Sequence, residues 1–415
     1  MLPERALVLG LARSGEAAAL GLARRGVSVR AVDRKPGLDA GRLLEAGVEV
    51  ILGADDAALV DGMDVLVKSP GVPSEAPLVA AARERGVAVW SEVEVGARLL
   101  ANPIVGVTGT NGKTTTSELL GAIFRAAGRP VSVAGNVGRP LTALDGVLAG
   151  DAWIVCELSS FQLEDICTFR PRIAVLLNLT PDHLDRHGTF EAYRAAKLRI
   201  FENQTADDVA VVPRGFGPVP GSGRRVEFGG GDELPGEPRI PGEHNRENAV
   251  AATAAARAAG IGDAAIGEGL RTFPGVPHRL ELVREVRGVR FVNDSKATNP
   301  EAAEKALSAY PPAIRLILGG SVKGTPYAGL ARRARESGVA RAYLIGEAAD
   351  EIADALAAEG VRFTSCGDLA AAVARAFADA EAGDVVLLSP ACASYDQFEN
   401  FEERGTRFRE LVEAL

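Results

Sequence analysis

The feature that most constrains this chain is a glycine-rich loop placed between an apolar stretch and an amphipathic one. Residues 103–105 are apolar, the run 106–116 reads Gly-Val-Thr-Gly-Thr-Asn-Gly-Lys-Thr-Thr-Thr, and residues 117–127 have the pattern of an amphipathic helix. Strand, loop and helix in this order are typical of a phosphate site, because backbone N–H groups can turn toward the anion. Lys113 adds a positive charge and Thr114 a hydroxyl that can bind Mg²⁺. The sequence therefore predicts a nucleoside triphosphate site.

The spacing of this loop differs from that of a strict P-loop. A strict P-loop requires a glycine five residues before Gly112, and that position is Val107. The pattern is instead G-x-x-G-K-T, a relative of the Walker A motif.

Length and charge limit the other possibilities. A chain of 415 residues exceeds the size of one hydrophobic core, so two or three domains are expected, and we predict three. The net charge of −9 and the lack of a basic block argue against nucleic-acid binding. No apolar run approaches the roughly 18 residues of a membrane span. We expect a cytoplasmic protein with no membrane contact, and a monomer.

Strand and helix patterns alternate in three successive blocks, which predicts an α/β fold with open parallel sheets. The predicted domains are residues 1–95, 96–275 and 276–415. The first and last are expected to be Rossmann-like, and the central one to be a P-loop-type ATP-binding domain. Linkers are expected near Gly96 and near residues 274–275.

Polar residues follow several predicted strands. Glu157 comes directly after the strand at 152–156, and His183 follows the strand at 173–177. Because ligands bind at the carboxyl edge of such sheets, Glu157 is a candidate Mg²⁺ ligand. An imidazole is an unusual Mg²⁺ ligand, so a hydrogen-bonding role remains open for His183.

Lys197 lies on an apolar helix face with Tyr193 and Phe201. Its stem could pack while the ammonium reaches outward. Alternatively, burial would lower its pKa, and a neutral amine can capture carbon dioxide as a carbamate that binds a metal.

In the third block, residues 293–300, 319–323 and 389–394 each follow a predicted strand. Two lysines, a threonine and a serine at one sheet edge favour a pocket for a small dianion.

Several motifs together resemble the Mur ligase family over nearly the whole chain. The central-domain motifs are residues 109–115, 157–162, 182–183, 195–199 and 242–245, and the motifs at 294–299 and 389–398 are similar to the D-glutamate-adding branch. The resemblance implies ATP-dependent ligation of D-glutamate to UDP-N-acetylmuramoyl-L-alanine through an acyl phosphate, in peptidoglycan (cell wall) precursor synthesis.

The resemblance also implies the roles of individual residues. Catalytic roles fall to Lys113, His183 and Lys197, and ATP binding to Gly109, Thr110, Asn111, Gly112, Lys113, Thr114, Thr115, Asn245, Asn248, Arg279 and Asp294. The UDP-sugar would contact Arg13, Ser14, Arg34, Gly71, Asn136 and His183, and D-glutamate would contact Lys296, Thr298, Lys323, Ser394 and Phe401. Two Mg²⁺ ions are expected, one on Thr114 and Glu157 and one on His183 and a carbamylated Lys197.

Two alternatives stay open at this point. The chain could be another Mur-type amino-acid ligase or a folylpolyglutamate synthetase. A nicotinamide-dependent dehydrogenase is disfavoured, because the turn at residues 10–15 lacks the middle glycine of G-x-G-x-x-G.

Overall fold

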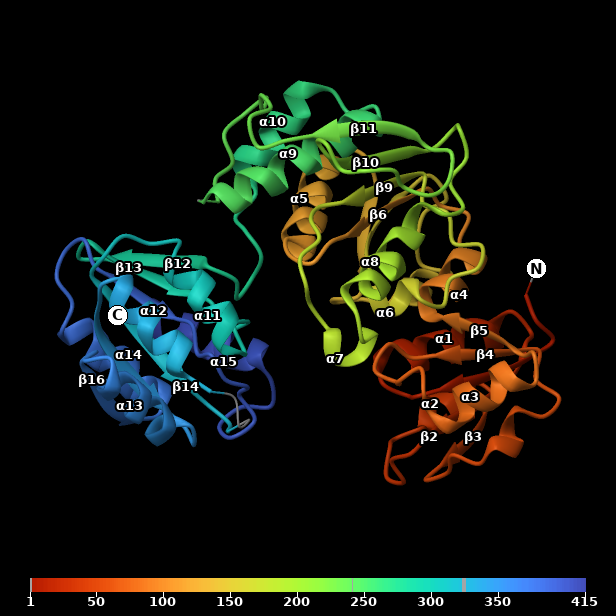
Figure 1. The fold of residues 1–415 in the computed structure, drawn as a ribbon, viewed down its shortest axis with the longest axis horizontal. Coiled ribbons are helices and arrows are strands. Elements are labelled where there is room, and N and C mark those ends of the chain that lie inside the picture. Colours follow the sequence, from red (N-terminus) through yellow and green to blue (C-terminus); the bar gives the residue numbers. More distant parts are fainter. Residues whose placement is uncertain (1, 241, 323–325) are drawn as a thin grey trace. The chain divides into compact units, whose positions relative to one another are not determined.

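The structure of the chain is a computed structural model that describes residues 2–240, 242–322 and 326–415. The chain divides into two compact units, Met1–Phe273 and Pro274–Leu415. The strands of the described residues form three sheets, two in the first unit and one in the second (Figure 1). The predicted α/β class with three serial sheets is confirmed.

The first sheet has the strand order β3–β2–β1–β4–β5 and is parallel throughout. Its elements are β1 (Arg5–Leu9), α1 (Arg13–Arg24), β2 (Ser28–Asp33), α2 (Gly41–Glu45), β3 (Glu49–Leu52), η1 (Ala57–Val60), β4 (Val65–Lys68), α3 (Pro77–Glu84) and β5 (Ala88–Ser91). The order reverses between β1 and β4, and open sheets bind ligands at such a switch point. The loops after these two strands are therefore placed at a potential ligand site.

Helix α4 (Glu92–Leu99) joins the first sheet to the central one. Gly96 lies inside this helix, and a Cβ atom there would come within 2.6 Å of the Cγ of Leu141 in η2 (Leu141–Leu144). The glycine thus lets two helical segments pack closely, and the linker predicted near it is a helix instead. The boundary between residues 95 and 96 stays a prediction.

The central sheet has the order β11–β10–β9–β6–β8–β7 and is also parallel. Its strands are β6 (Ile104–Thr108), β7 (Val131–Gly135), β8 (Trp153–Glu157), β9 (Ile173–Leu176), β10 (Val209–Pro213) and β11 (Arg224–Phe228). Its helical segments, besides η2, are α5 (Lys113–Ala126), α6 (Ser160–Leu163), α7 (Leu184–His187), α8 (Phe190–Leu198), η3 (Arg199–Phe201), α9 (Glu243–Ala258) and α10 (Asp263–Thr272).

Strand β6 lies in the middle of this sheet, with β8 and β9 on its two sides. All five of its residues are buried, as the apolar composition of a central parallel strand requires. Helix α5 packs against α9 and α10 (Figure 1). The glycine-rich loop therefore leaves the sheet at its switch point.

The second unit contains one sheet of order β12–β13–β17–β14–β15–β16, in which only the β12–β13 pair is antiparallel among the described strands. Its elements are β12 (Glu281–Val286), β13 (Val289–Asn293), α11 (Pro300–Leu307), β14 (Ile314–Gly319), α12 (Ala328–Glu336), β15 (Val339–Ile345), α13 (Ala349–Ala358), β16 (Phe363–Gly367), α14 (Leu369–Ala378), β17 (Val385–Leu388) and α15 (Phe401–Glu413). Strand β17 lies between β13 and β14, so the loops after these three strands share one sheet edge.

Candidate functional site

The glycine-rich loop turns into α5 at Gly112. This residue has a φ of 83°, a left-handed conformation that favours glycine. A Cβ atom there would also lie 2.2 Å from Oδ1 of Asn248 in α9. Asn248 in turn donates to Oδ1 of Asn245 at 3.5 Å. The fold thus brings the two predicted asparagines together, with Asn248 against the predicted phosphate loop.

The loop is fastened from its other side by residues that follow β9. The backbone N–H of Asn111 donates to Oδ1 of Asn178 at 2.9 Å, and that of Thr110 donates to the Asn178 carbonyl at 3.1 Å. The hydroxyls of Thr110 and Tyr193 are 3.0 Å apart and share a hydrogen bond. Asn178 and Tyr193 were not predicted as site residues, although Asn178 stands directly after a predicted strand.

Two lysines converge on one carbonyl of the loop. Nζ of Lys113 donates to the oxygen of Gly109 at 2.9 Å, and Nζ of Lys197 donates to the same oxygen at 2.8 Å. Lys197 is only 2% exposed, and its ammonium lies 4.9 Å from the centre of the Tyr193 ring. The alternative in which Lys197 reaches outward is therefore wrong.

The surroundings of Lys197 change its acid–base chemistry. Burial, followed by the positive charge of Lys113, lowers the pKa of Lys197 to about 7, while Asp182 and Glu157 act in the opposite direction. Near neutral pH this side chain is thus divided between ammonium and amine, and the amine is the form that can react with an electrophile.

Glu157 lies at the carboxyl end of β8 and is 3% exposed. Its Oε1 accepts from the Asn136 side chain at 3.0 Å, and its carbonyl accepts from the Asn136 backbone at 2.9 Å. Gly135 permits this approach, because its φ is 113° and a Cβ atom would meet the Glu157 carbonyl at 2.2 Å. Glu157 and Asn136 therefore form one polar group at the sheet edge.

His183 lies just before α7, in a left-handed conformation with φ of 51°. Its side chain is 49% exposed, and its ring centre is 4.9 Å from that of Phe161 and 6.4 Å from that of Tyr193. The imidazole is thus accessible to a ligand while its backbone is constrained.

The predicted Mg²⁺ ligands mix several residue types. Within the residues that the structure describes, no three His, Cys, Asp or Glu side chains come together as a metal site. The predicted ligands are Thr114 and Glu157 for one ion, and His183 and a modified Lys197 for the other. Neither pair contains three His, Cys, Asp or Glu side chains, so the prediction does not depend on such a cluster. A buried carboxylate and a hydroxyl fit Mg²⁺, which prefers oxygen ligands.

The predicted UDP residues lie around the switch point of the first sheet. Arg13 and Ser14 begin α1, and Gly71 lies in the loop after β4. Ser69 ties the two loops together, because its hydroxyl donates to the Gly10 carbonyl at 2.6 Å. Arg34 follows the neighbouring β2, is 61% exposed and pairs with Asp55 at 3.4 Å.

In the second unit, Asp294 directly follows β13 and accepts from the Ser389 hydroxyl at 2.7 Å. Burial raises the pKa of Asp294 to about 7, against the effects of that hydrogen bond and of the positive charge on Arg279. Two of the predicted ATP residues, Asp294 and Arg279, thus lie close enough for the arginine charge to affect the carboxyl group.

The predicted D-glutamate residues lie on loops that one buried arginine connects. Arg404 of α15 is 1% exposed and donates through Nη2 to the carbonyls of Ser295 at 2.9 Å and Cys392 at 3.1 Å. These loops carry Lys296, Thr298 and Ser394, and the Ser295 hydroxyl also donates to the Phe401 carbonyl at 2.8 Å. Lys323 lies outside the described residues. Arg404 was not predicted, although its spacing from Phe408 and Val412 places it on the apolar face of its helix and could have marked it.

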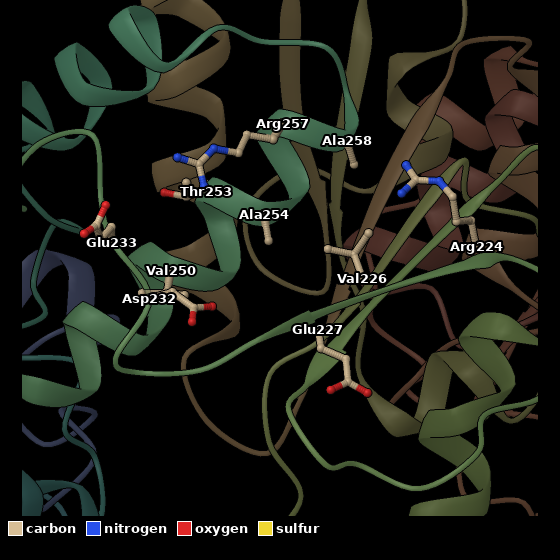
Figure 2. Close-up of a pocket in the computed structure, with 10 residues that line it drawn as sticks. All are labelled: Arg224, Val226, Glu227, Asp232, Glu233, Val250, Thr253, Ala254, Arg257 and Ala258. Atoms are coloured by element: carbon tan, nitrogen blue, oxygen red, sulfur yellow. The ribbon is translucent and has the colours of Figure 1, made fainter.

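A separate pocket of about 310 Å³ lies between α9 and β11 (Figure 2). It is lined by Arg224, Val226, Glu227, Asp232, Glu233, Val250, Thr253, Ala254, Arg257 and Ala258. None of the predicted site residues is among them, so this pocket is not part of the loop site.

Comparison with known proteins identifies three domain types along the chain. Residues 4–91 match the family model described as Mur ligase MurD-like, N-terminal domain. Residues 107–215 match the Mur ligase middle domain, and residues 278–392 match the Mur ligase, glutamate ligase domain.

Relatives match over nearly their full length. A protein of Anaeromyxobacter dehalogenans is 48% identical, with 98% of this chain and 97% of the relative covered. One of Solibacter usitatus is 45% identical, with 99% and 98% covered. Both relatives are named UDP-N-acetylmuramoylalanine--D-glutamate ligase.

Solved structures share the fold at low identity. The UDP-N-acetylmuramate-alanine ligase MurC of Thermotoga maritima has a TM-score of 0.60 at 18% identity, with both chains fully covered. MurF ligase of the same organism, in complex with ADP, also has a TM-score of 0.60 at 18% identity, with 93% of this chain and 95% of that chain covered.

The contact at Gly112 gives a testable prediction. We expect Gly112→Ala to weaken ATP binding about tenfold or more, because the added methyl group clashes with Asn248 and the residue is strained in a left-handed conformation. Isothermal titration of ATP measures this effect. Gly128→Ala is the matched control, since Gly128 has a φ of 67° but no atom lies within 4 Å of the position that its Cβ would take. Equal affinity losses in the two variants would refute the role of the contact.

Proposed function

The chain belongs to the Mur ligase family, and on this premise we propose that it joins D-glutamate to UDP-N-acetylmuramoyl-L-alanine with ATP as phosphate donor. The observation that carries the proposal is the convergence of Lys113 and Lys197 on the predicted phosphate loop. The names of relatives that are 40–48% identical support the choice of D-glutamate.

The reaction has two steps. An oxygen of the L-alanine carboxylate attacks the γ-phosphorus of ATP, the bond to the β-phosphate oxygen breaks, and ADP leaves. The D-glutamate amine then attacks the acyl carbon, phosphate leaves and the nitrogen loses a proton. Such chemistry depends mainly on positioning and on neutralising negative charge.

The residues of the loop are suited to the first step. Backbone N–H groups of residues 112–115 would bind the phosphates at the start of α5, where the helix dipole favours negative charge. The N–H groups of Thr110 and Asn111 are instead held by Asn178. The ammonium of Lys113 lies at this loop and would move from the carbonyls of Gly109 and Thr110 to the phosphates. Asn245 and Asn248 from α9, and Arg279 and Asp294, are proposed to bind the rest of ATP.

We also propose two Mg²⁺ sites. Thr114 and Glu157 would hold one ion, and His183 and Lys197 the other. Mg²⁺ supplies neutralisation of the phosphate charge in reactions of this class. The buried Glu157 carboxylate supports the first site.

Lys197 can join the second site only as an anion. Its neutral amine would attack carbon dioxide, form one nitrogen–carbon bond and release a proton, which leaves a carbamate. The lowered pKa of Lys197 supports this step, because the required amine is populated near pH 7.

For the substrates, we propose the contacts that the family resemblance implies. The UDP-sugar would contact Arg13, Ser14, Arg34, Gly71, Asn136 and His183, and D-glutamate would contact Lys296, Thr298, Lys323, Ser394 and Phe401. Within the described residues no helix is long and apolar enough to cross a bilayer. We propose that the protein acts as a monomer in the cytoplasm, on precursors of peptidoglycan.

The carbamate makes a prediction for Lys197. We expect Lys197→Ala to lose more than about 99% of its turnover. ATP binding should stay within about threefold of wild type, because Lys113 and Asn178 still hold the loop when the hydrogen bond from Lys197 to Gly109 is lost. With ¹³C-labelled bicarbonate, the wild-type protein should give a carbamate NMR signal that weakens below pH 7, as the amine is protonated. Lys305→Ala, on the exposed side of α11, is the control. Near-normal turnover in Lys197→Ala would contradict the carbamate.

The choice of substrate is tested with a panel of amino acids. Phosphate release is measured with ATP and UDP-N-acetylmuramoyl-L-alanine, adding D- and L-amino acids one at a time. We expect D-glutamate alone to stimulate release above background. Stimulation by another amino acid instead would favour a different Mur-type ligase, and folylpolyglutamate synthesis would require activity on a folate.

A further inference from the structure

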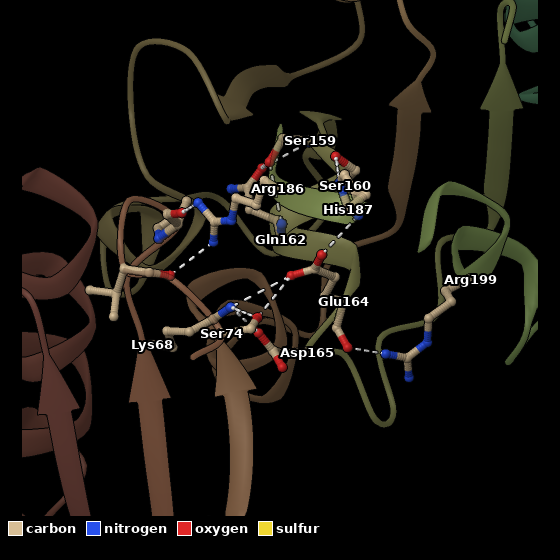
Figure 3. Close-up of polar contacts among 12 residues, drawn as sticks. Lys68, Ser74, Ser159, Ser160, Gln162, Glu164, Asp165, Arg186, His187 and Arg199 are labelled. Atoms are coloured by element: carbon tan, nitrogen blue, oxygen red, sulfur yellow. Dashed lines mark hydrogen bonds and ion pairs between the residues drawn. The ribbon is translucent and has the colours of Figure 1, made fainter. Parts of the chain in front are cut away.

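A chain of polar contacts joins the loop after β4 to the segment that carries His183 (Figure 3). We call residues 69–76 the β4 loop and residues 181–188 the His183 segment. The β4 loop contains Gly71, a proposed UDP contact. The two segments belong to different sheets of the first unit, so their relative position depends on contacts between side chains.

The chain of contacts begins at Lys68, the last residue of β4. This lysine is 1% exposed, and its Nζ lies 2.7 Å from Oδ2 of Asp165 and 3.6 Å from Oε2 of Glu164. The Ser74 hydroxyl lies between, accepting from Lys68 at 3.1 Å and donating to Glu164 at 3.3 Å. A buried ammonium is therefore matched by acids from the end of α6.

The chain of contacts continues from Glu164 to the His183 segment. The other carboxylate oxygen of Glu164 lies 3.1 Å from Nδ1 of His187, whose Nε2 is 2.9 Å from the Ser160 hydroxyl. The His187 ring stacks on Phe161 with centres 5.4 Å apart, and the His183 ring also packs against Phe161, at 4.9 Å. Both ring nitrogens of His187 are thus held, and its side chain is only 3% exposed.

A second link runs parallel to the first. Arg186 donates to the carbonyls of Pro70 at 2.9 Å and Val72 at 2.8 Å, on both sides of Gly71. Its guanidinium also lies 3.9 Å from the centre of the Phe161 ring. The β4 loop and the His183 segment are therefore connected directly as well as through Glu164.

We propose that Lys68, Glu164 and His187 form a positioning bridge, which fixes His183 relative to the loop that contacts the sugar nucleotide. The inference rests on the proposed function for the identity of the substrate. In the proposed reaction, the UDP end of the substrate is bound by one loop while its carboxylate reacts near His183. A change in the distance between the β4 loop and His183 would therefore misplace the carboxylate and slow catalysis. The bridge residues do not touch substrate, and they act through the His183 segment.

The test compares two ion pairs that join the same two sheets. Lys68→Met removes the bridge charge at the carboxyl end of the first sheet. Arg25→Met is the control. It removes a half-exposed guanidinium that lies 2.6 Å from Asp145, directly after the C-terminal end of α1, and Arg24 remains 3.8 Å from the same carboxylate. Steady-state kinetics are measured for both variants, with hydrogen exchange of the His183 segment by mass spectrometry.

We expect Lys68→Met to lower kcat about tenfold and to raise the KM for UDP-N-acetylmuramoyl-L-alanine, with an unchanged KM for ATP. Its His183 segment should exchange faster than in wild type. Arg25→Met should keep wild-type kinetics and exchange in this segment. Wild-type kinetics in folded Lys68→Met, or the same change in both variants, would overturn the proposal.

Removing the buried cation takes from Asp165 its nearest positive charge and leaves it only the Arg83 guanidinium at 3.4 Å, so Lys68→Met could fail to fold. The double variant Lys68→Met/Asp165→Asn removes one charge of each sign. We expect it, like Lys68→Met, to lower kcat and to raise the KM for UDP-N-acetylmuramoyl-L-alanine without changing the KM for ATP. Wild-type values in this folded double variant would also overturn the bridge. If the wild-type protein did not use D-glutamate, the proposed function would fail, whereas the exchange experiment would still decide whether the bridge holds the His183 segment.

Discussion

The carbonyl oxygen of Gly109 accepts hydrogen bonds from two lysine side chains, and the organisation of the site depends on this convergence. One lysine begins the helix after the loop, and the other lies on α8, far along the sequence. The parallel sheet makes the meeting possible, because β6 ends between β8 and β9 and the carboxyl ends of all three strands share an edge. Burial and neighbouring positive charge then lower the pKa of Lys197 to about 7.

The groups around these lysines are held by contacts that leave little freedom. Asn178 and Tyr193 fasten the loop on one side, and Asn248 lies against Gly112 on the other. Similar buried polar contacts recur in the second unit, where Arg404 connects the loops after β13 and β17. Reactions that proceed by positioning require such rigid supports, since small displacements of reacting groups have large effects on rate.

Much of this arrangement could be predicted from the sequence, because an apolar run followed by polar or glycine residues marks a strand and the loop after it within a few neighbouring residues. The strands before Gly109, Glu157 and Asp294 were recognisable for this reason, and so was the apolar face that carries Lys197. Pattern alone left two orientations open for Lys197, and only its partner, the Gly109 carbonyl, decides between them.

The contacts that sequence reasoning missed join residues distant in the chain. Lys68 ends strand β4, but its pairing with Asp165 depends on how two sheets pack against each other. Arg404 shares the apolar face of its helix with Phe408, but its carbonyl partners lie on loops that are distant in the sequence. Gly96 suggested a linker, but it lets α4 pack closely on η2. The sequence did not distinguish these roles, because flexible linkers and close packing both favour glycine.

We propose that this site activates a carboxylate, and transfer of an oxygen isotope tests that step. The substrate UDP-N-acetylmuramoyl-L-alanine is prepared with ¹⁸O in the alanine carboxylate, and the released phosphate is analysed by mass spectrometry after turnover with ATP and D-glutamate. An acyl phosphate predicts that each phosphate released carries one oxygen from that carboxylate. Phosphate without ¹⁸O would mean that water or another group attacks ATP, and would rule out the acyl phosphate.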